Sequence, residues 1–203
     1  MTDDPRNGQS VERAAIPEGW SVPNADPDKP SAARSAVSWL ITIGIALAVV
    51  LIVQIFLVKV YSIPSASMVH TLEVGDRVIV SKLSTDPGRG DIVVFNRPPN
   101  DPASSPDDPE VLIKRVIGLP GETVDSREGK VYVDGRLLNE DYLAEGTFTQ
   151  IDAPIKIPAG HILVLGDNRQ VSKDGRFFGP IAKTLVVGRA VLRIWPLGRA
   201  GSL

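Results

Sequence analysis

The chain has 203 residues, a formal net charge of −2, two histidines and no cysteine. That length accommodates one domain of ordinary size plus about forty further residues. The absence of cysteine excludes disulfides and thiolate chemistry, and the scattered Lys and Arg residues argue against a nucleic-acid partner. So few histidines argue against a multi-histidine metal site, and hydrolytic chemistry would use Ser, Lys, Asp or Glu and at most one His.

The first 35 residues are rich in Pro, Asp, Ser and Ala and show no sustained period of two or of 3.6 residues. Such a composition cannot bury enough apolar surface to offset the entropy lost on ordering. We therefore predict that residues 1–35 form a disordered tail.

Residues 36–58 contain no charged side chain. Because an α-helix needs roughly 20 apolar residues to cross the hydrocarbon core, we predict a single transmembrane helix. A buried core helix rarely stays uncharged on every face, and the h-region of a cleaved signal peptide spans roughly 7 to 15 residues, so both alternatives fit less well. Lys29 and Arg34 balance Lys59 and Arg77 across the run, so charge bias does not decide its orientation.

Beyond residue 59 the chain consists of short runs rich in Val and Ile, separated by Gly, Asp and Pro, which predict β-strands. The predicted strands are residues 77–83, 91–95, 111–118, 130–133, 136–138, 161–166 and 185–195. Asp134-Gly135 favours a two-residue hairpin turn of type I′, and the Pro/Asp/Ser-rich residues 97–110 predict a mobile loop. Since no helical period follows, we expect residues 60–203 to form a mainly β domain, an antiparallel sandwich or partly open barrel.

Two serines follow the apolar run closely, within the segment SIPSASM at residues 62–68. Pro64 fixes its own φ and stiffens the segment, and the hydroxyls of Ser65 and Ser67 fall on one side if the segment is extended. Serines in such a place more often belong to a linker than act as nucleophiles. The pattern alone therefore leaves both interpretations open.

Lys114 lies inside the apolar strand at residues 111–118. A lysine on a β surface is usually an edge or solvated residue. Beside an apolar site, however, desolvation would lower its pKa and leave a neutral amine able to take a proton from a serine. The sequence does not say which face Lys114 occupies.

A third segment, residues 166–176, is dense in Gly, Asp, Asn and Ser and reads GDNRQVSKDGR. This composition is typical of a surface turn. The functional interpretation is that its serine orients the lysine amine while an ion pair between Asp174 and Arg176 braces the loop.

Together these segments resemble the type I signal peptidases (leader peptidases), which are membrane-anchored serine proteases with a Ser/Lys dyad. The motifs follow in the family's order as IPSASMVHTL, GDRVIVSKL, RGDIVVF, IKRVIGLPGE and GDNRQVSKDGR. The resemblance extends from about Tyr61 to Pro196, nearly the whole part after the apolar run. Such an ordered set is far more specific than any one motif.

The resemblance implies that Ser67 is the nucleophile and Lys114 the general base. The Ser65 hydroxyl and the Ser67 backbone N–H would form the oxyanion hole, and Ser172 would hydrogen-bond the Lys114 amine. Asp174 and Arg176 would support the site from outside. Shallow apolar pockets would admit only small side chains at the −1 and −3 positions of a preprotein, because larger ones would clash. By the same resemblance, these pockets are lined by Ile63, Pro64, Met68, Leu72 and Ile113.

The function implied is a membrane-bound serine endopeptidase that removes N-terminal signal peptides from secreted preproteins through an acyl-enzyme, with neither a metal nor a cofactor. Its partners would be preproteins and the lipid bilayer, and it would act as a monomer. The resemblance also implies a single-pass protein of the plasma membrane, with a cytoplasmic tail at residues 1–35 and an extracytoplasmic peptidase domain at residues 60–203.

Two positions depart from the family's pattern. The family usually has Pro where this chain has His70, and Asp-Asn is common where it has Gln170-Val171. The dyad residues are present, so we expect these departures to affect rate and substrate preference rather than the reaction. His70 lies only three residues from Ser67 along the chain, which is a poor placement for a base.

Other interpretations stay open from the residues alone. His161 with Asp167 and Asp174 would permit a Ser-His-Asp triad, since triads are defined by geometry, although the ordered motifs argue against it. Self-cleaving SOS-response repressors also use a Ser/Lys dyad, but they would carry a DNA-binding segment and no membrane span. From another class, the chain would be a non-catalytic anchored β-domain that binds exported partners.

Overall fold

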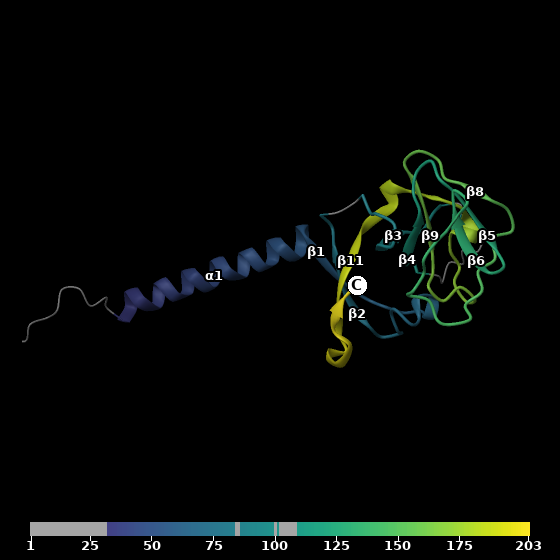
Figure 1. Ribbon diagram of the computed structural model, residues 1–203. Helices are drawn as coiled ribbons and strands as arrows, with labels where there is room; N and C mark the ends of the chain where they lie inside the picture. The colour runs from purple at the N-terminus through teal and green to yellow at the C-terminus, as the bar shows by residue number, and fades with distance from the viewer. Residues whose placement is uncertain (1–31, 84–85, 100, 102–108) are drawn as a thin grey trace, which may run out of the picture. The chain divides into compact units, whose positions relative to one another are not determined.

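The computed structural model describes residues 32–83, 86–99, 101 and 109–203 (Figure 1). The predicted disordered tail falls mostly on residues 1–31 and the predicted mobile loop mostly on residues 102–108, so both predictions lie largely outside the described residues. The structure has two units, divided between Ile45 and Ala46, and each is described by itself.

Helix α1 comprises Ala32–Phe56, so it begins and ends slightly earlier than the helix predicted at residues 36–58. Large apolar side chains of its first part are exposed, among them Trp39, Leu40 and Ile41. Thr42 Oγ1 donates to the carbonyl of Ser38 at 2.9 Å, so this hydroxyl is satisfied within the helix. Over the described side chains, no helix combines the length and the apolar character that crossing a membrane requires.

The second unit contains a large and a small antiparallel sheet. The large sheet has the order β1-β2-β11-β3-β4-β9-β10, with β12 paired to β11. Its strands are β1 (Val58–Ser62), β2 (Arg77–Ser81), β3 (Ile92–Asn96), β4 (Val111–Gly118), β9 (His161–Leu165), β10 (Ile181–Ala182), β11 (Val186–Trp195) and β12 (Gly201–Ser202). The small sheet, drawn at the far end from β1 in Figure 1, has the order β7-β6-β5-β8. Its strands are β5 (Thr123–Arg127), β6 (Lys130–Val133), β7 (Arg136–Leu137) and β8 (Ile155–Lys156).

The prediction of a mainly β, antiparallel domain is confirmed, and every predicted strand is present with small shifts at its ends. Asp134 and Gly135 have φ values of +47° and +76°, as a type I′ turn between β6 and β7 requires. The prediction missed β1, β5 and the short strands β8, β10 and β12. Only the first residue of β1 was assigned to the apolar helix, and the rest was given no secondary structure. β5 is mostly polar, and two-residue strands have too few side chains to show a period.

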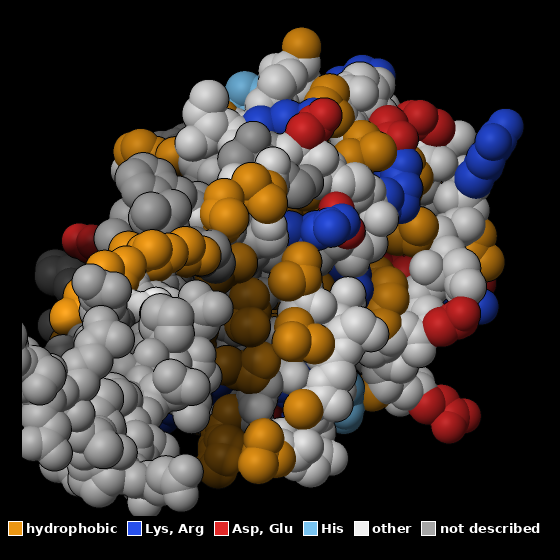
Figure 2. All heavy atoms as spheres, turned by 90° about the vertical axis from the view of Figure 1, so that its left-hand side faces the viewer, with side chains coloured by type: hydrophobic (Ala, Val, Ile, Leu, Met, Phe, Trp, Pro, Cys, Tyr) orange, Lys and Arg blue, Asp and Glu red, His pale blue; other side chains and the backbone are white. Residues whose placement is uncertain are grey.

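Short helical segments connect the strands: η1 (Ala66–Met68), α2 (Gly175–Phe178), η2 (Lys183–Leu185) and η3 (Leu197–Arg199). Strand β3 is covered on both faces, because Val94 packs into one core cluster while Val93 and Phe95 pack into another. Strand β4 reaches the small sheet at Gly118, where an added Cβ would lie 2.2 Å from Ile157 Cδ1. The two sheets therefore meet at β4. Hydrophobic side chains also reach the surface, and Figure 2 shows a group of them on one face among charged side chains.

Candidate active site

The segment after β1 carries Ser67 in the short helix η1. The apolar side chains on either side of it, Ile63, Met68 and Leu72, are at most 2% exposed and pack into the core beneath the sheet. Ser67 itself is 7% exposed. Burial of these neighbours fixes the segment and leaves the Ser67 hydroxyl at the edge of the core.

Lys114 reaches this hydroxyl from β4, whose register with β3 pairs Lys114 with Val93. Its Nζ lies 2.6 Å from Ser67 Oγ and 2.9 Å from the carbonyl oxygen of Ile113. The side chain is 3% exposed, so Lys114 occupies the buried face that the sequence left undecided.

Burial lowers the pKa of Lys114 from 10.5 to about 8, although the nearby carboxylates of Asp174 and Asp167 act in the opposite direction. The positive charge of Arg97 contributes to the lowering. A pKa of about 8 leaves about a tenth of the amine neutral at pH 7, against about one part in three thousand for an unperturbed lysine. Lys114 is thus able to accept a proton from Ser67 near neutral pH.

Ser65 lies beside the pair, with its Oγ 3.4 Å from Ser67 Oγ. Its hydroxyl is a donor on the same side of the segment, as the alternation of the two serines predicted. Loop 166–176 approaches the same segment from β9. Asn168 donates its backbone N–H to the carbonyl of Ser67 at 3.0 Å and its side-chain amide to the carbonyl of Ala66 at 3.1 Å.

The ion pair between Asp174 and Arg176 is present within loop 166–176, with Nε and Oδ1 2.9 Å apart. Asp174 is fully buried and also accepts the backbone N–H of Gly166 at 2.9 Å. Arg176 donates to the carbonyl of Arg169 at 2.6 Å and to that of Ser172 at 3.2 Å. The pair therefore links the two ends of the loop through its backbone at Gly166, Arg169 and Ser172.

The hydrogen bond expected between Ser172 and the Lys114 amine is not formed. Ser172 is 3% exposed, and its Oγ has no hydrogen-bond partner among the described residues. The hydroxyl lies beside Gly166, where an added Cβ would be only 2.2 Å from it. The Lys114 amine instead donates hydrogen bonds to Ser67 Oγ and to the carbonyl of Ile113.

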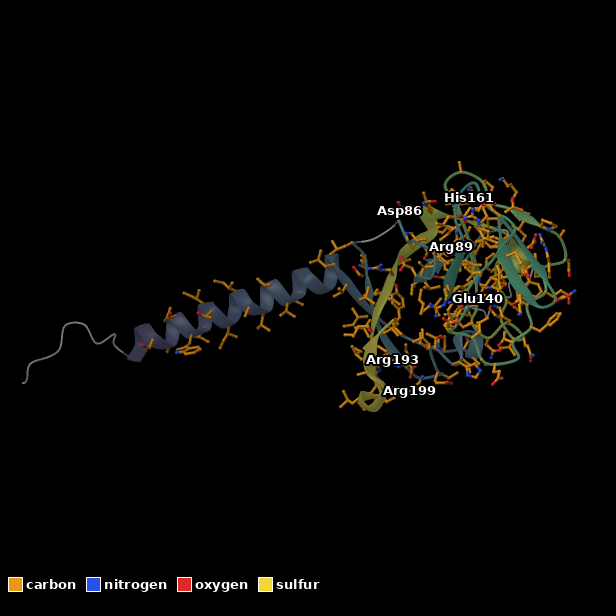
Figure 3. All side chains as sticks on the ribbon, viewed as in Figure 1. Asp86, Arg89, Glu140, His161, Arg193 and Arg199 are labelled. Atoms are coloured by element: carbon orange, nitrogen blue, oxygen red, sulfur yellow. The ribbon has the colours of Figure 1, made fainter. Side chains whose placement is uncertain are left out.

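The segment that follows Ser67 is held to β11 and η3. Asp76 is 2% exposed and lies 3.3 Å from Arg199 Nη1 and 3.7 Å from Arg193 Nη1. Arg193 also donates to the carbonyl of Thr71 at 2.7 Å. Figure 3 shows both arginines close to the end of β11.

Two neighbouring cavities share part of their lining near Ser67 and Lys114. One, of about 290 Å³, is lined by both dyad residues together with Ser65, Ala66, Arg97, Asp101, Pro109, Leu112, Val171 and Lys173. The other, of about 340 Å³, is lined mainly by apolar residues, including the predicted pocket residues Ile63, Pro64 and Ile113. Leu112 and Pro109 line both cavities. The remaining predicted pocket residues, Met68 and Leu72, are fully buried in the core beneath.

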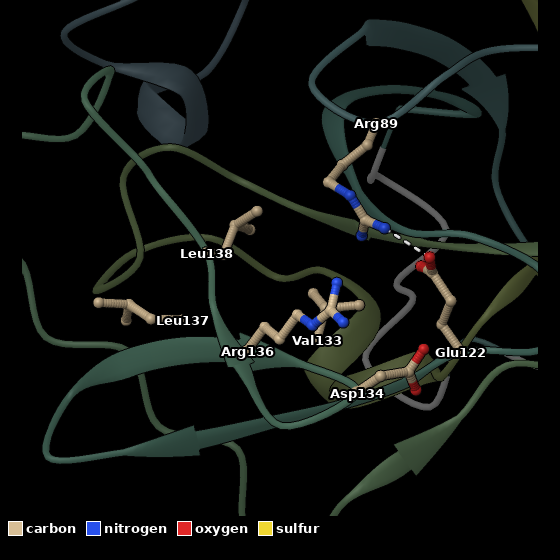
Figure 4. Close-up of a pocket in the computed structure, with 7 residues that line it drawn as sticks. All are labelled: Arg89, Glu122, Val133, Asp134, Arg136, Leu137 and Leu138. Carbon is tan, nitrogen blue, oxygen red and sulfur yellow. Dashed lines mark hydrogen bonds and ion pairs between the residues drawn. The ribbon is translucent and has the colours of Figure 1, made fainter.

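A separate hollow of about 460 Å³ lies between the small sheet and the segment before β3 (Figure 4). Its lining includes the ion pair between Arg89 and Glu122, whose Nη2 and Oε1 are 2.5 Å apart. No serine, lysine or histidine lines it, and its two carboxylates are already engaged, Glu122 with Arg89 and Asp134 with the backbone N–H of Thr123. The smaller cavity at Ser67 and Lys114 is therefore the candidate active site.

Neither histidine forms a triad. The Nδ1 atom of His161 lies 3.0 Å from the carbonyl of Ala159, while Asp167 pairs with Arg115 and Asp174 with Arg176. Figure 3 shows His161 at one edge of the domain. The triad interpretation is therefore wrong for this geometry.

His70 is exposed and has a φ of +83°. Proline cannot adopt this value, because its ring holds φ near −65°. The chain therefore takes a different turn here from the one that the family's usual proline would impose.

Sequence reasoning missed a buried polar cluster behind Ser67 and Lys114. Arg115 makes two hydrogen bonds to Asp167, at 2.9 and 2.7 Å, and both residues are less than one-tenth exposed. Arg169, 2% exposed, pairs with Glu140. The available signal was the charged residue Arg115 in an otherwise apolar strand, directly after Lys114.

Comparison with known proteins identifies relatives of this chain. The family model for signal peptidase, peptidase S26, matches residues 36–195. Signal peptidase I of Leptolyngbya laminosa is 42% identical over 187 residues, covering 90% of this chain and 92% of that protein. Signal peptidase IB of Staphylococcus aureus strain Mu50 is 37% identical over 183 residues, covering 80% and 91%. A crystal structure of a signal peptidase I from Enterococcus faecalis V583 shares 33% identity, covers 51% of this chain and 96% of that chain, and has a TM-score of 0.41. The chain belongs to the signal peptidase family, peptidase S26, and is a serine endopeptidase.

Proposed function

We propose that Ser67 and Lys114 are the catalytic dyad with which this signal peptidase removes signal peptides from secretory preproteins. The observation that carries the proposal is the 2.6 Å contact between Lys114 Nζ and Ser67 Oγ. A base must lie within hydrogen-bond reach of the proton it removes, and its pKa should be near the working pH. Lys114 meets both conditions, because burial lowers its pKa to about 8.

The reaction follows from this arrangement. Neutral Lys114 takes the proton of Ser67 as Oγ attacks the carbonyl carbon of the −1 residue, and the tetrahedral intermediate collapses with cleavage of the C–N bond. The protonated Lys114 returns the proton to the leaving amine of the mature protein. Lys114 then takes a proton from the water that attacks the acyl-enzyme carbonyl and gives it to Ser67 Oγ as the ester C–O bond breaks, which restores both residues.

Ser65 and the backbone N–H of Ser67 are proposed as the oxyanion donors. The 3.4 Å between the two serine Oγ atoms supports this assignment, because it leaves the Ser65 hydroxyl beside the reacting carbonyl. Loss of one such donor costs about 10²- to 10³-fold in kcat. Ser65→Ala should therefore slow turnover by that amount and leave KM nearly unchanged.

The two cavities are proposed to hold the small side chains at the −1 and −3 positions. Ile63, Pro64 and Ile113 give one of them an apolar lining, and Leu112 lines both, including the one that holds Ser67 and Lys114. A preprotein with a bulky residue at −1 should resist cleavage, because the side chain would clash with this lining.

A membrane anchor at residues 36–58 is a further part of the proposal, supported by the absence of charge in that run. The tail would be cytoplasmic, the peptidase domain extracytoplasmic, and the enzyme a monomer. Carbonate extraction of membranes should leave the native chain in the pellet and release a chain with both Ile45→Lys and Leu47→Lys. Release of the native chain would contradict the anchor. Protease added outside spheroplasts should digest the peptidase domain. Protection of this domain from the protease would show the opposite orientation in the membrane.

The dyad is tested by cleavage of a preprotein with small residues at −3 and −1, using the full chain in detergent. Ser67→Ala and Lys114→Met should each lose more than about 10³-fold in turnover, as removal of a nucleophile or its base does. Lys130→Met, at an exposed lysine of β6, is the matched control and should keep native activity. Equal activity of Lys114→Met and the native chain would end the dyad proposal. A non-catalytic β-domain, by contrast, would cleave nothing in any variant.

A further inference from the structure

A loop from the small sheet reaches the residues directly behind the dyad. It comprises residues 138–149, between β7 and β8, and carries Glu140 and Tyr142. Neither side chain lines the cavity that contains Ser67 and Lys114. Their contacts are instead with two buried arginines, each of which belongs to a different half of the site.

Tyr142 contacts the strand of the general base. The guanidinium carbon of Arg115 lies 3.9 Å from the centre of the Tyr142 ring, and Arg115 follows Lys114 directly on β4. A cation held over an aromatic face in a desolvated place is attracted by the ring. Arg115 also makes the two hydrogen bonds to Asp167. The guanidinium therefore contacts the Tyr142 ring and also links β4 to loop 166–176.

Glu140 contacts the loop that holds the nucleophile. Its Oε1 accepts the Tyr142 hydroxyl at 2.7 Å and Arg169 Nη2 at 2.5 Å. Arg169 in turn donates its Nε to the carbonyl of Gly166 at 3.0 Å. Burial, together with the charge of Glu140, raises the pKa of Tyr142 above its ordinary value, so the phenol stays a donor at working pH.

The two connections meet at Ser67. Asn168, between Asp167 and Arg169, donates its backbone N–H to the Ser67 carbonyl, while β4 carries Lys114. We propose that Tyr142 and Glu140 are positioning residues, which brace β4 against loop 166–176 and so keep the Lys114 amine within reach of Ser67 Oγ. This inference rests on the proposed dyad. A displacement of about 1 Å in such a pair can cost on the order of 10²-fold in rate.

The test compares Tyr142→Leu and Tyr142→Phe with the native full chain in detergent. The measurements are kcat, KM, the pH profile of kcat/KM, and the fraction of active enzyme titrated with a serine-acylating inhibitor. Tyr142→Leu should lower kcat per active site by about 10- to 100-fold, with KM within about twofold. Its activity should also rise at higher pH than in the native enzyme, because a loosened Lys114 is better solvated. Tyr142→Phe keeps the ring over Arg115 and should lose less.

The matched control is Tyr132→Leu in β6, since Tyr132 lies under Arg127 at 4.8 Å in the small sheet. It should lower thermal stability and leave kcat per active site unchanged. If Tyr142→Leu behaves in the same way, the positioning role is overturned. If Tyr142→Leu does not fold, Glu140→Gln is measured instead, and native kcat with a native pH profile in that variant overturns the role equally. Lys114→Met separates the two proposals, because its full activity would defeat the dyad, whereas native kcat in Tyr142→Leu defeats only the positioning.

Discussion

Asn168 donates its backbone N–H to the carbonyl oxygen of Ser67 at 3.0 Å, across 101 positions of sequence. Through this bond the loop after β9 holds the backbone of the proposed nucleophile from one side. Lys114 on β4 reaches the hydroxyl of the same residue from another. The geometry of the dyad therefore depends on contacts among three separate segments.

Gly166→Ala should disable the site. An added Cβ would lie 2.6 Å from the carbonyl oxygen of Ser67, which is backbone and cannot move without shifting the nucleophile. We expect kcat/KM to fall by about 10²-fold, together with a lower Tm. Gly198→Ala is the control, because nothing lies within 4 Å of its added Cβ. Native activity in Gly166→Ala would show that the loop does not constrain Ser67.

The pH dependence of turnover should follow Lys114. Because burial lowers the pKa of this amine to about 8, with Arg97 assisting and Asp174 and Asp167 opposing, kcat/KM should rise with pH and level off above about pH 8. Initial rates of preprotein cleavage in buffers from pH 6 to about 10 measure this. A rate that is constant over the whole range would contradict a lysine base.

Stability should depend on pH through the same group. Below about pH 8 Lys114 is protonated in both states, and the native state bears the full cost of burying the charge. Between about pH 8 and pH 10.5 Lys114 loses its proton in the native state and keeps it in the unfolded chain. The free energy of unfolding therefore rises with pH. Relative to Lys114→Met, the native chain should gain about 3 kcal/mol across this window. Urea unfolding of both proteins at pH 7 and near pH 10 would detect it, and a constant difference would show that Lys114 is not buried as a charge.

Ser172→Ala should separate stability from activity. The Ser172 hydroxyl is buried without a partner, so its removal should leave the free energy of unfolding unchanged or raise it by up to about 1 kcal/mol. Because the hydroxyl has no hydrogen bond to give up, it is able to turn toward the Lys114 amine during the reaction. We therefore expect kcat to fall about tenfold or more. An unchanged kcat would assign Ser172 no part in the reaction.

Much of the local structure was determined by the sequence alone. Runs such as residues 111–118 and 161–165 are rich in Val, Leu and Ile, and their alternation or continuous apolar character predicts strands whatever they pair with. Asp134-Gly135 predicts its turn because both residues tolerate positive φ. Ser67, Lys114 and loop 166–176 were identified as candidates from residue type and from the order of the motifs.

Only the tertiary structure decided which candidates meet. The face of β4 on which Lys114 lies depends on the register with β3, and a shift of one residue would turn the amine to the other face. The direction of the Ser172 hydroxyl depends on packing against Gly166, and the contact between Arg115 and Tyr142 depends on how a loop of one sheet lies against a strand of the other. These are contacts between side chains that lie far apart in the sequence, and neither the periodicity nor the composition of a segment encodes them. The sequence by itself therefore determined the helices, strands and turns, whereas the tertiary structure determined the site.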